Sequence, residues 1–113
     1  MNPKDINKPE DLDLNEPEDF YNLNPEQREI LTNWIRANLK PIKSVNKRHT
    51  SYGLKHYFEH DKENKGFYIT NGQFKGAMLE CGFKPYKEFE LNWHFCISEK
   101  SITELKKRGL FDT

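Results

Sequence analysis

Histidines, cysteines and clustered cations are the side chains of this sequence that could do chemistry. His49, His56 and His60 are seven and four positions apart, so a helix that began at His49 would carry all three on one side. A zinc site needs ligands of matched geometry with supporting hydrogen bonds, and no second pair with ligand spacing completes His94 and Cys96. We therefore expect no metal site, and we interpret the three histidines as exposed or as phosphate contacts.

Catalytic chemistry is not expected either. Cys81 falls on the apolar side of a predicted helix, where burial raises the pKa of a thiol and makes it unreactive. Gly72 and Gly76 have the wrong spacing for a phosphate-cradling loop, and no paired carboxylates fall on an element that would face a cleft. The sequence therefore predicts a binding protein and no enzyme, with no cofactor and no small-molecule substrate.

Basic and amide side chains form the strongest pattern. Residues 28–58 carry seven cations and one acid, a local net charge of +6. Such cations suit phosphate contacts, while side chains on the outer face of a recognition helix, Gln73 and Lys75 here, would lie near bases. The candidate nucleic-acid-binding residues are Lys43, Lys47, Arg48, His49, Lys55, Asn71, Gln73, Lys75 and Lys84. The alternative is that these cations only solvate the surface.

An acidic leader precedes this basic stretch. Residues 1–20 hold seven acids and two lysines, a net charge of −5, whereas residues 21–113 carry +5. The leader has too few apolar residues to offset its chain entropy, so we expect it to be disordered unless it docks on the basic face or on a partner. The candidate partner-binding residues are Asp11, Asp13, Glu16, Glu18 and Asp19.

Helices must position these candidates. Asn24 can cap a helix whose first position suits Pro25 and which ends by residue 40. The basic connector that follows holds Ile42 and Val45, which we expect to dip back to the core.

Two more helices are predicted after the connector. Thr50 or Ser51 caps a helix that runs to about residue 60, in which Gly53 suggests close packing of another element. A third helix is expected over residues 72–81, with Asn71 as its cap. Gly82 followed by Phe83 is the pattern of a Schellman ending.

Short strands and a closing helix complete the expected elements. Residues 67–69 read as a strand before the third helix, and 91–98 as a returning strand after a turn or wing tip. A capping box from Ser101 to Glu104 begins the closing helix, which stops at Gly109. The predicted core consists of Trp34, Leu54, Phe58, Phe74, Met78, Trp93 and Phe95.

This order of elements indicates an α+β fold: a small winged-helix-like domain with three main helices, short β-strands and a closing helix. Residues 1–22 form the extended acidic flexible leader, and residues 23–113 form the domain. With no long apolar run and no secretory signal, the chain is expected to be cytoplasmic, with no membrane partner and with its two cysteines reduced.

Two resemblances add to this interpretation. The stretch YITNGQFKGAMLECGF, closed by NWHFCI, lies within residues 68–97 and resembles the C-terminal winged-helix segment of phage and poxvirus type primase-helicases. Residues 25–100, with SYGLKH and NW, are similar to small uncharacterised proteins of phages and mobile elements of Gram-positive bacteria. The first resemblance implies a fold and the second a genetic setting. Neither transfers a catalytic activity.

The leading hypothesis is a nucleic-acid-associated accessory protein of a phage or mobile element, which binds nucleic acid through a basic helical face, with DNA favoured over RNA. The alternative is a protein-binding inhibitor or adaptor, for example a phage anti-defence protein, that blocks a host nucleic-acid-processing protein. The acidic leader would serve this second role as an anchor on a basic protein surface.

Overall fold

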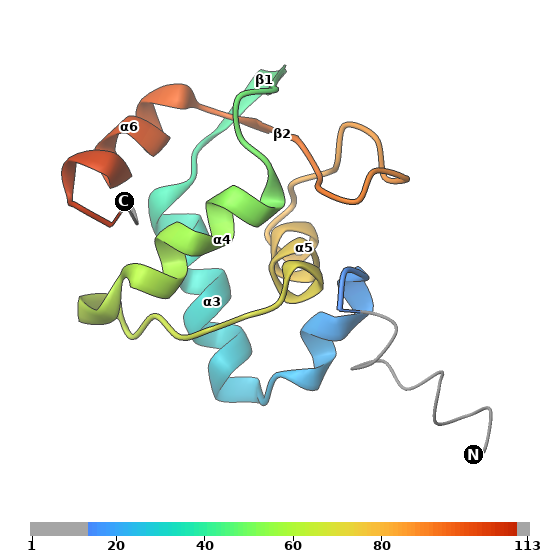
Figure 1. Cartoon of the computed structure of the whole chain (residues 1–113), viewed down its shortest axis with the longest axis vertical. Helices are drawn as coiled ribbons and strands as arrows, with labels where there is room; N and C mark the ends of the chain where they lie inside the picture. The colour runs from blue at the N-terminus through green and yellow to red at the C-terminus, as the bar shows by residue number, and fades with distance from the viewer. Residues whose placement is uncertain (1–13, 111–113) are drawn as a thin grey trace.

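Helices make up most of this computed structural model, which describes residues 14–110, and a pair of short strands lies at one edge (Figure 1). The elements in chain order are η1 (Pro17–Asn22), α3 (Pro25–Asn38), β1 (Pro41–Asn46), α4 (Ser51–His60), η2 (Lys62–Asn64), α5 (Asn71–Glu80), β2 (Phe95–Ile97) and α6 (Glu99–Lys107). The two strands are antiparallel, with Pro41 opposite Ile97 and Asn46 opposite Phe95. The result is a small compact α+β domain, as predicted. No helix in residues 14–110 is long and apolar enough to cross a membrane.

The first two main helices begin where their capping residues predict. The Asn24 side chain accepts from the Gln27 amide at 2.8 Å, and the Gln27 side chain accepts from the Asn24 amide at 3.0 Å. Thr50 caps α4 by accepting from the amide of Gly53. Local hydrogen bonding therefore sets both helix starts.

Gly53 does not have the close neighbour that the sequence suggested. A Cβ atom built at this position would meet only the Thr50 hydroxyl oxygen, at 3.9 Å. We expect Gly53→Ala to raise the free energy of unfolding by about 0.5–1 kcal/mol, because alanine loses less backbone entropy on helix formation. Urea denaturation followed by circular dichroism would measure this gain, and a loss of stability would show that the site is crowded.

The helix α5 is capped by Thr70 rather than by Asn71. The Thr70 hydroxyl accepts from the Gln73 amide, and the Gln73 side chain accepts from the Thr70 amide, which makes a capping box. The predicted Schellman ending is confirmed, since the Phe83 amide donates to the Met78 carbonyl and Gly82 has a φ of +90°.

The strands differ most from the sequence-based prediction. The connector after α3 is strand β1, and Ile42 is 43% exposed there instead of dipping into the core. Residues 67–69 are extended but unpaired, and the Ile69 amide donates to the Glu59 carboxylate of α4. Only Phe95–Ile97 of the predicted 91–98 strand pairs. The closing helix is capped by Ser98, three residues before the predicted capping box.

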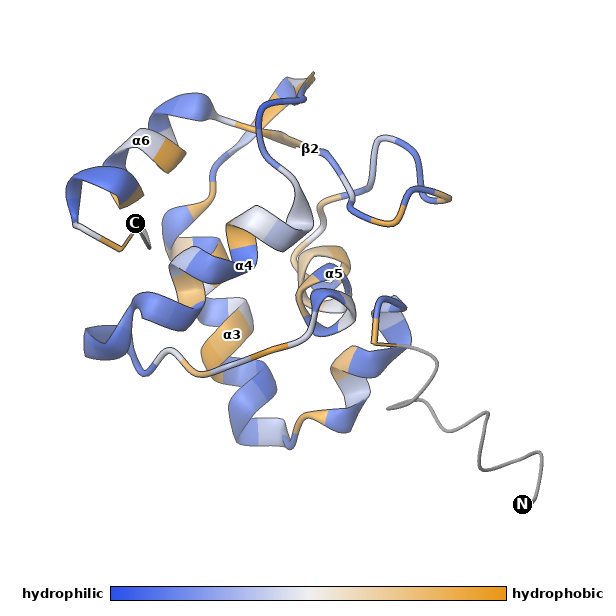
Figure 2. Ribbon diagram, in the orientation of Figure 1, coloured by the Kyte–Doolittle hydropathy of each residue, from blue (hydrophilic) through white to orange (hydrophobic). Residues whose placement is uncertain are grey.

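The predicted core is confirmed. All seven predicted residues are buried, from Phe58, Phe74 and Met78 at 0% exposure to Trp34 and Trp93 at 4%. Figure 2 shows the corresponding pattern along the ribbon, with hydrophobic and hydrophilic residues alternating within the helices. Phe20 and Leu23 also belong to this core, although the sequence placed Phe20 in the leader.

The segment of residues 14–22 packs against α5 (Figure 1). Two glycines on α5 make this approach possible, because a Cβ on Gly72 would lie 2.2 Å from the Glu16 carbonyl oxygen and one on Gly76 would lie 2.3 Å from Phe20 Cβ. The Gly72 amide also donates to the Leu14 carbonyl at 2.7 Å. Part of the predicted flexible leader is therefore a packed part of the domain.

Candidate nucleic-acid interface

Lys75, predicted to lie near bases, is buried beneath the segment of residues 14–22. Its side chain is 2% exposed, its Nζ donates to the Asn15 carbonyl at 2.8 Å, and the same atom lies 4.7 Å from the centre of the Trp93 ring. Burial lowers the pKa of Lys75, partly offset by the charge of Glu16. The assignment of Lys75 to an exposed face was wrong, because residues of the leader cover that face.

Asn71 and Gln73 also have structural partners on α5. Asn71 is 5% exposed, accepts from the Ser51 hydroxyl, and donates to the side chains of Asn15 and Asn92. Gln73 is half-buried and makes the capping box with Thr70. The outer face of α5 is therefore not presented to solvent as a recognition helix would be.

Lys55 and His49 each contact a carboxylate of the same domain. Lys55 is 3% exposed, with its Nζ 2.9 Å from Glu59 Oε2 and 5.1 Å from each of the Tyr52 and Tyr68 ring centres. His49 Nε2 lies 3.0 Å from Glu99 Oε1. These contacts link α4 to the 67–69 segment and the β1–α4 turn to α6, so both side chains hold the fold together.

The pKa of Glu99 lies below its ordinary value. The hydrogen bond from the Asn46 side chain lowers it most, burial opposes this, and the His49 bond and the charge of Arg48 lower it further. The negative charge of Glu99 is thus retained beside the basic turn.

Other candidate cations remain exposed and free of ion pairs. Lys43, Lys47 and Arg48 lie on β1 and the turn after it, and Lys84 begins the loop that follows α5. None of the salt bridges between residues 14–110 involves these four side chains. They are the part of the predicted site that a nucleic acid could reach in this structure.

Tyr86 joins the two exposed segments, and sequence reasoning missed it. Lys47 Nζ lies 5.0 Å from the centre of the Tyr86 ring, and Lys87 Nζ lies 5.3 Å from it. Tyr86 itself is 47% exposed. The sequence did contain a signal for Tyr86, because it lies between Lys84 and Lys87, and an aromatic ring among cations is typical of surfaces that bind nucleic acid. We call this set the Lys47–Tyr86 surface: Lys43, Lys47, Arg48, Lys84, Tyr86 and Lys87.

The acidic candidates divide into three groups. Glu16 and Glu18 are exposed beside α5, while Asp11 and Asp13 lie outside the described residues. Asp19 is 2% exposed and accepts hydrogen bonds from the Thr70 hydroxyl and the Asn22 amide group. Asp19 is therefore occupied within the fold, and of the candidate partner-binding acids that the structure describes, only Glu16 and Glu18 are exposed.

The histidines and cysteines have ordinary surroundings. His56 bonds to Glu59, His60 bonds to the His56 carbonyl, and no group of three potential metal ligands forms within residues 14–110. Cys81 and Cys96 are free and half-buried, and burial raises the pKa of the Cys81 thiol.

A buried carboxylate holds the C-terminal helix to the rest of the domain. Asp61 is 1% exposed and accepts from Trp34 Nε1 at 2.9 Å, from Arg108 Nη2 at 2.7 Å and from the Asn64 amide group. An open cavity of about 480 Å³ beside this cluster is lined by Asn33, Asn38 and Arg108, among others. The cluster was not predicted, because its members come from three separate segments: Trp34 of α3, Asp61 and Asn64 at η2, and Arg108 at the end of α6.

Acid should weaken the fold through Asp61. Burial raises the pKa of this carboxyl, but the bonds from Trp34, Asn64 and Arg108 outweigh burial and place the pKa below its ordinary value. A lowered folded-state pKa contributes stability above pH about 4 that is lost as the pH falls further.

We expect Asp61→Asn to lower the free energy of unfolding by about 1.5–3 kcal/mol at pH 7. The difference from the native chain should shrink in urea titrations as the pH falls below about 4 and through the lowered pKa of Asp61, where the native carboxyl becomes protonated. A difference that stayed constant between neutral and acid pH would exclude this carboxylate as a source of acid sensitivity.

Comparison of the chain with protein-family models, with curated proteins and with solved structures finds no match.

Proposed function

We propose that this protein is a nucleic-acid-associated accessory protein, with DNA as its first candidate ligand, and that it binds through the Lys47–Tyr86 surface. The observation that carries the proposal is the pair of exposed lysines at the Tyr86 ring, Lys47 and Lys87, with the exposed cations Lys43, Arg48 and Lys84 on the same two segments. Each phosphate that a lysine or arginine neutralises releases counterions, which supplies most of the affinity of such proteins.

The order of elements supports a winged-helix-like interpretation. The order α3, β1, α4, α5 and β2, with β1 paired to β2, is similar to the order of helices and strands in such a domain, although residues 84–94 form no second strand of a wing. In this chain α6 follows β2, and residues 14–22 cover α5. The proposal therefore moves the binding surface from the third main helix to the strand turn and the loop. The resemblance to phage and mobile-element proteins suggests the genetic setting.

A fluorescence anisotropy titration with labelled DNA at several salt concentrations tests the proposal. We expect binding at about 50 mM salt that weakens steeply by about 200 mM. The double variant Lys47→Gln, Lys87→Gln should bind more weakly, and its dependence of log K on log salt should be shallower by about 2, because about two phosphate contacts are lost.

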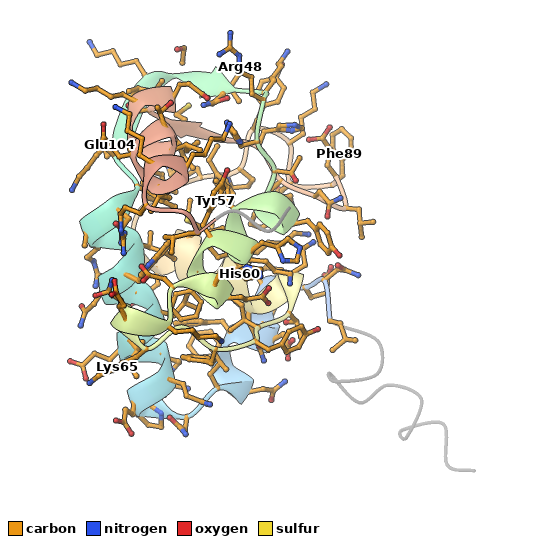
Figure 3. All side chains as sticks on the ribbon, turned by 60° about the vertical axis from the view of Figure 1, so that its left-hand side comes forward. Arg48, Tyr57, His60, Lys65, Phe89 and Glu104 are labelled. Atoms are coloured by element: carbon orange, nitrogen blue, oxygen red, sulfur yellow. The ribbon has the colours of Figure 1, made fainter. Side chains whose placement is uncertain are left out.

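The matched control for that experiment is the double variant Lys62→Gln, Lys65→Gln. These two lysines are also exposed, and Figure 3 shows Lys65 at the opposite end of the molecule from Arg48. The control should bind DNA as the native chain does. Absence of binding at low salt, or equal losses in the two double variants, would remove the proposal.

Exposed apolar side chains favour a second candidate, a protein-binding inhibitor or adaptor that blocks a nucleic-acid-processing protein. Phe89 and Leu91 are 83% and 62% exposed in the loop before β2, and large apolar side chains of this kind are common in protein interfaces. Affinity purification with nuclease treatment would separate protein partners from those bridged by nucleic acid. A partner lost on nuclease treatment would argue against the adaptor.

To measure how much the leader contributes to binding such a partner, the truncation must leave the packed segment of residues 14–22 intact. Removing residues 1–13 leaves residues 14–22 in place on α5, whereas removing residues 1–20 would take away Phe20 from the core. A partner retained equally by the truncated chain would place its binding site on the described domain.

A further inference from the structure

Phe89 has the greatest exposure of any large hydrophobic side chain in residues 14–110, at 83%. It lies three residues after Tyr86 in the loop between α5 and β2, so the Lys47–Tyr86 surface is bordered by a second free aromatic ring. Figure 3 shows Phe89 at the outer edge of the molecule. A phenyl ring in this position has no packing role within the described domain.

Hydrogen bonds hold this loop in place. The Tyr86 amide donates to the His94 carbonyl at 2.8 Å, and Trp93 Nε1 donates to the Glu88 carbonyl at 3.0 Å. The Glu90 amide closes a turn on the Lys87 carbonyl at 3.2 Å. Both aromatic side chains are therefore presented from a braced backbone, which reduces the entropy lost when a ligand binds.

The charges around the two rings favour an anionic ligand. Residues 41–49 and 84–94 together contain five lysines and arginines and two glutamates, Glu88 and Glu90. Glu90 faces His94, with its Oε1 3.4 Å from His94 Nδ1. The cations outnumber the acids, and Lys47 and Lys87 lie directly at the Tyr86 ring.

We infer that the nucleic acid bound at this surface is single-stranded, with a base stacked on Phe89 and phosphates on Lys47 and Lys87, whose ammonium groups lie over the Tyr86 ring. This inference rests on the proposed function. A base can stack on an exposed aromatic side chain only when a face of the base itself is free, as in a single strand. In a duplex the neighbouring base pairs cover the faces of each base. The helix that would read a duplex groove in a winged-helix-like domain is α5, and its Asn71 and Lys75 are buried.

The test compares one labelled oligonucleotide as a single strand and annealed to its complement, at the same low salt. We expect the single strand to bind at least about tenfold more tightly. Phe89→Ser should weaken binding of the single strand by about tenfold, the loss of one stacked base, and should leave duplex binding unchanged. Tyr68→Ser is the matched control, because Tyr68 is 74% exposed on a different segment.

Each outcome separates this inference from the proposed function. Equal binding of both forms with a normal salt dependence overturns the single-strand inference and leaves the proposed function standing. If Phe89→Ser and Tyr68→Ser lose the same affinity for the single strand, the assignment of base stacking to the loop is overturned. No binding of either form at low salt overturns both proposals. Circular dichroism of each variant confirms that its fold is kept.

Discussion

Phe74→Ala should lower the free energy of unfolding by about 3–5 kcal/mol, because the side chain is fully buried and its removal leaves a cavity. Phe74 lies on α5, which packs against η1, α3 and α4, so neighbouring elements cannot all collapse into the space. Urea denaturation monitored by tryptophan fluorescence and circular dichroism measures the loss.

The control for this substitution is Leu79→Ala on the same helix. Leu79 is 41% exposed, so its truncation should change stability by less than about 1 kcal/mol. A loss below about 1 kcal/mol for Phe74→Ala as well would mean that α5 is not the centre of the core.

Gly76→Ala is the second large effect. The added Cβ would lie 2.3 Å from both the Pro17 carbonyl oxygen and Phe20 Cβ, and the carbonyl belongs to backbone that cannot rotate away. Either the helix shifts or residues 14–22 lift from α5, and we expect a loss of about 1–3 kcal/mol or more. Limited proteolysis should then cut the N-terminal segment faster than in the native chain.

Gly53→Ala is the control for this substitution, because it adds the same methyl group at an uncrowded helical position and is expected to stabilise the fold. A Gly76→Ala variant with native stability and native proteolysis would show that residues 14–22 are not packed on α5. Lys75 would then be exposed to solvent, and α5 would again be a candidate recognition helix.

Local patterns explain why much of the fold could be predicted from the sequence. The starts of α3 and α4 and the end of α5 depend on residues within one turn of each helix, such as Asn24, Thr50 and Gly82. The core followed from large apolar side chains at helical spacing and, for Trp93 and Phe95, at the alternating spacing of a strand, because such apolar faces must be buried.

Contacts between distant segments account for what the sequence did not predict. Asn15 and Lys75 are 60 positions apart, and nothing in the acidic composition of the leader indicates that its end packs on a helix. The spacing of Gly72 and Gly76 was the available signal, since two glycines four apart leave one side of a helix open to a backbone.

The candidate site was predicted only in part, for a related reason. Spacing along the chain identifies cations but not their partners, so Lys55 was assigned to phosphates although Glu59, one helical turn later, pairs with it. Lys43, Lys47, Arg48 and Lys84 are exposed as expected. Tyr86 joins them only because the turn after β1 meets the loop after α5.

The most direct measurement of the central claim is a titration of the ¹⁵N-labelled chain with a short oligonucleotide, followed by amide chemical shifts. We predict that the largest shifts fall on residues 43–48 and 84–91, with little change along α5 and residues 14–22. Shifts confined to α5 and residues 14–22 would contradict it, because they would mean that the nucleic acid displaces the packed segment and binds the helix beneath.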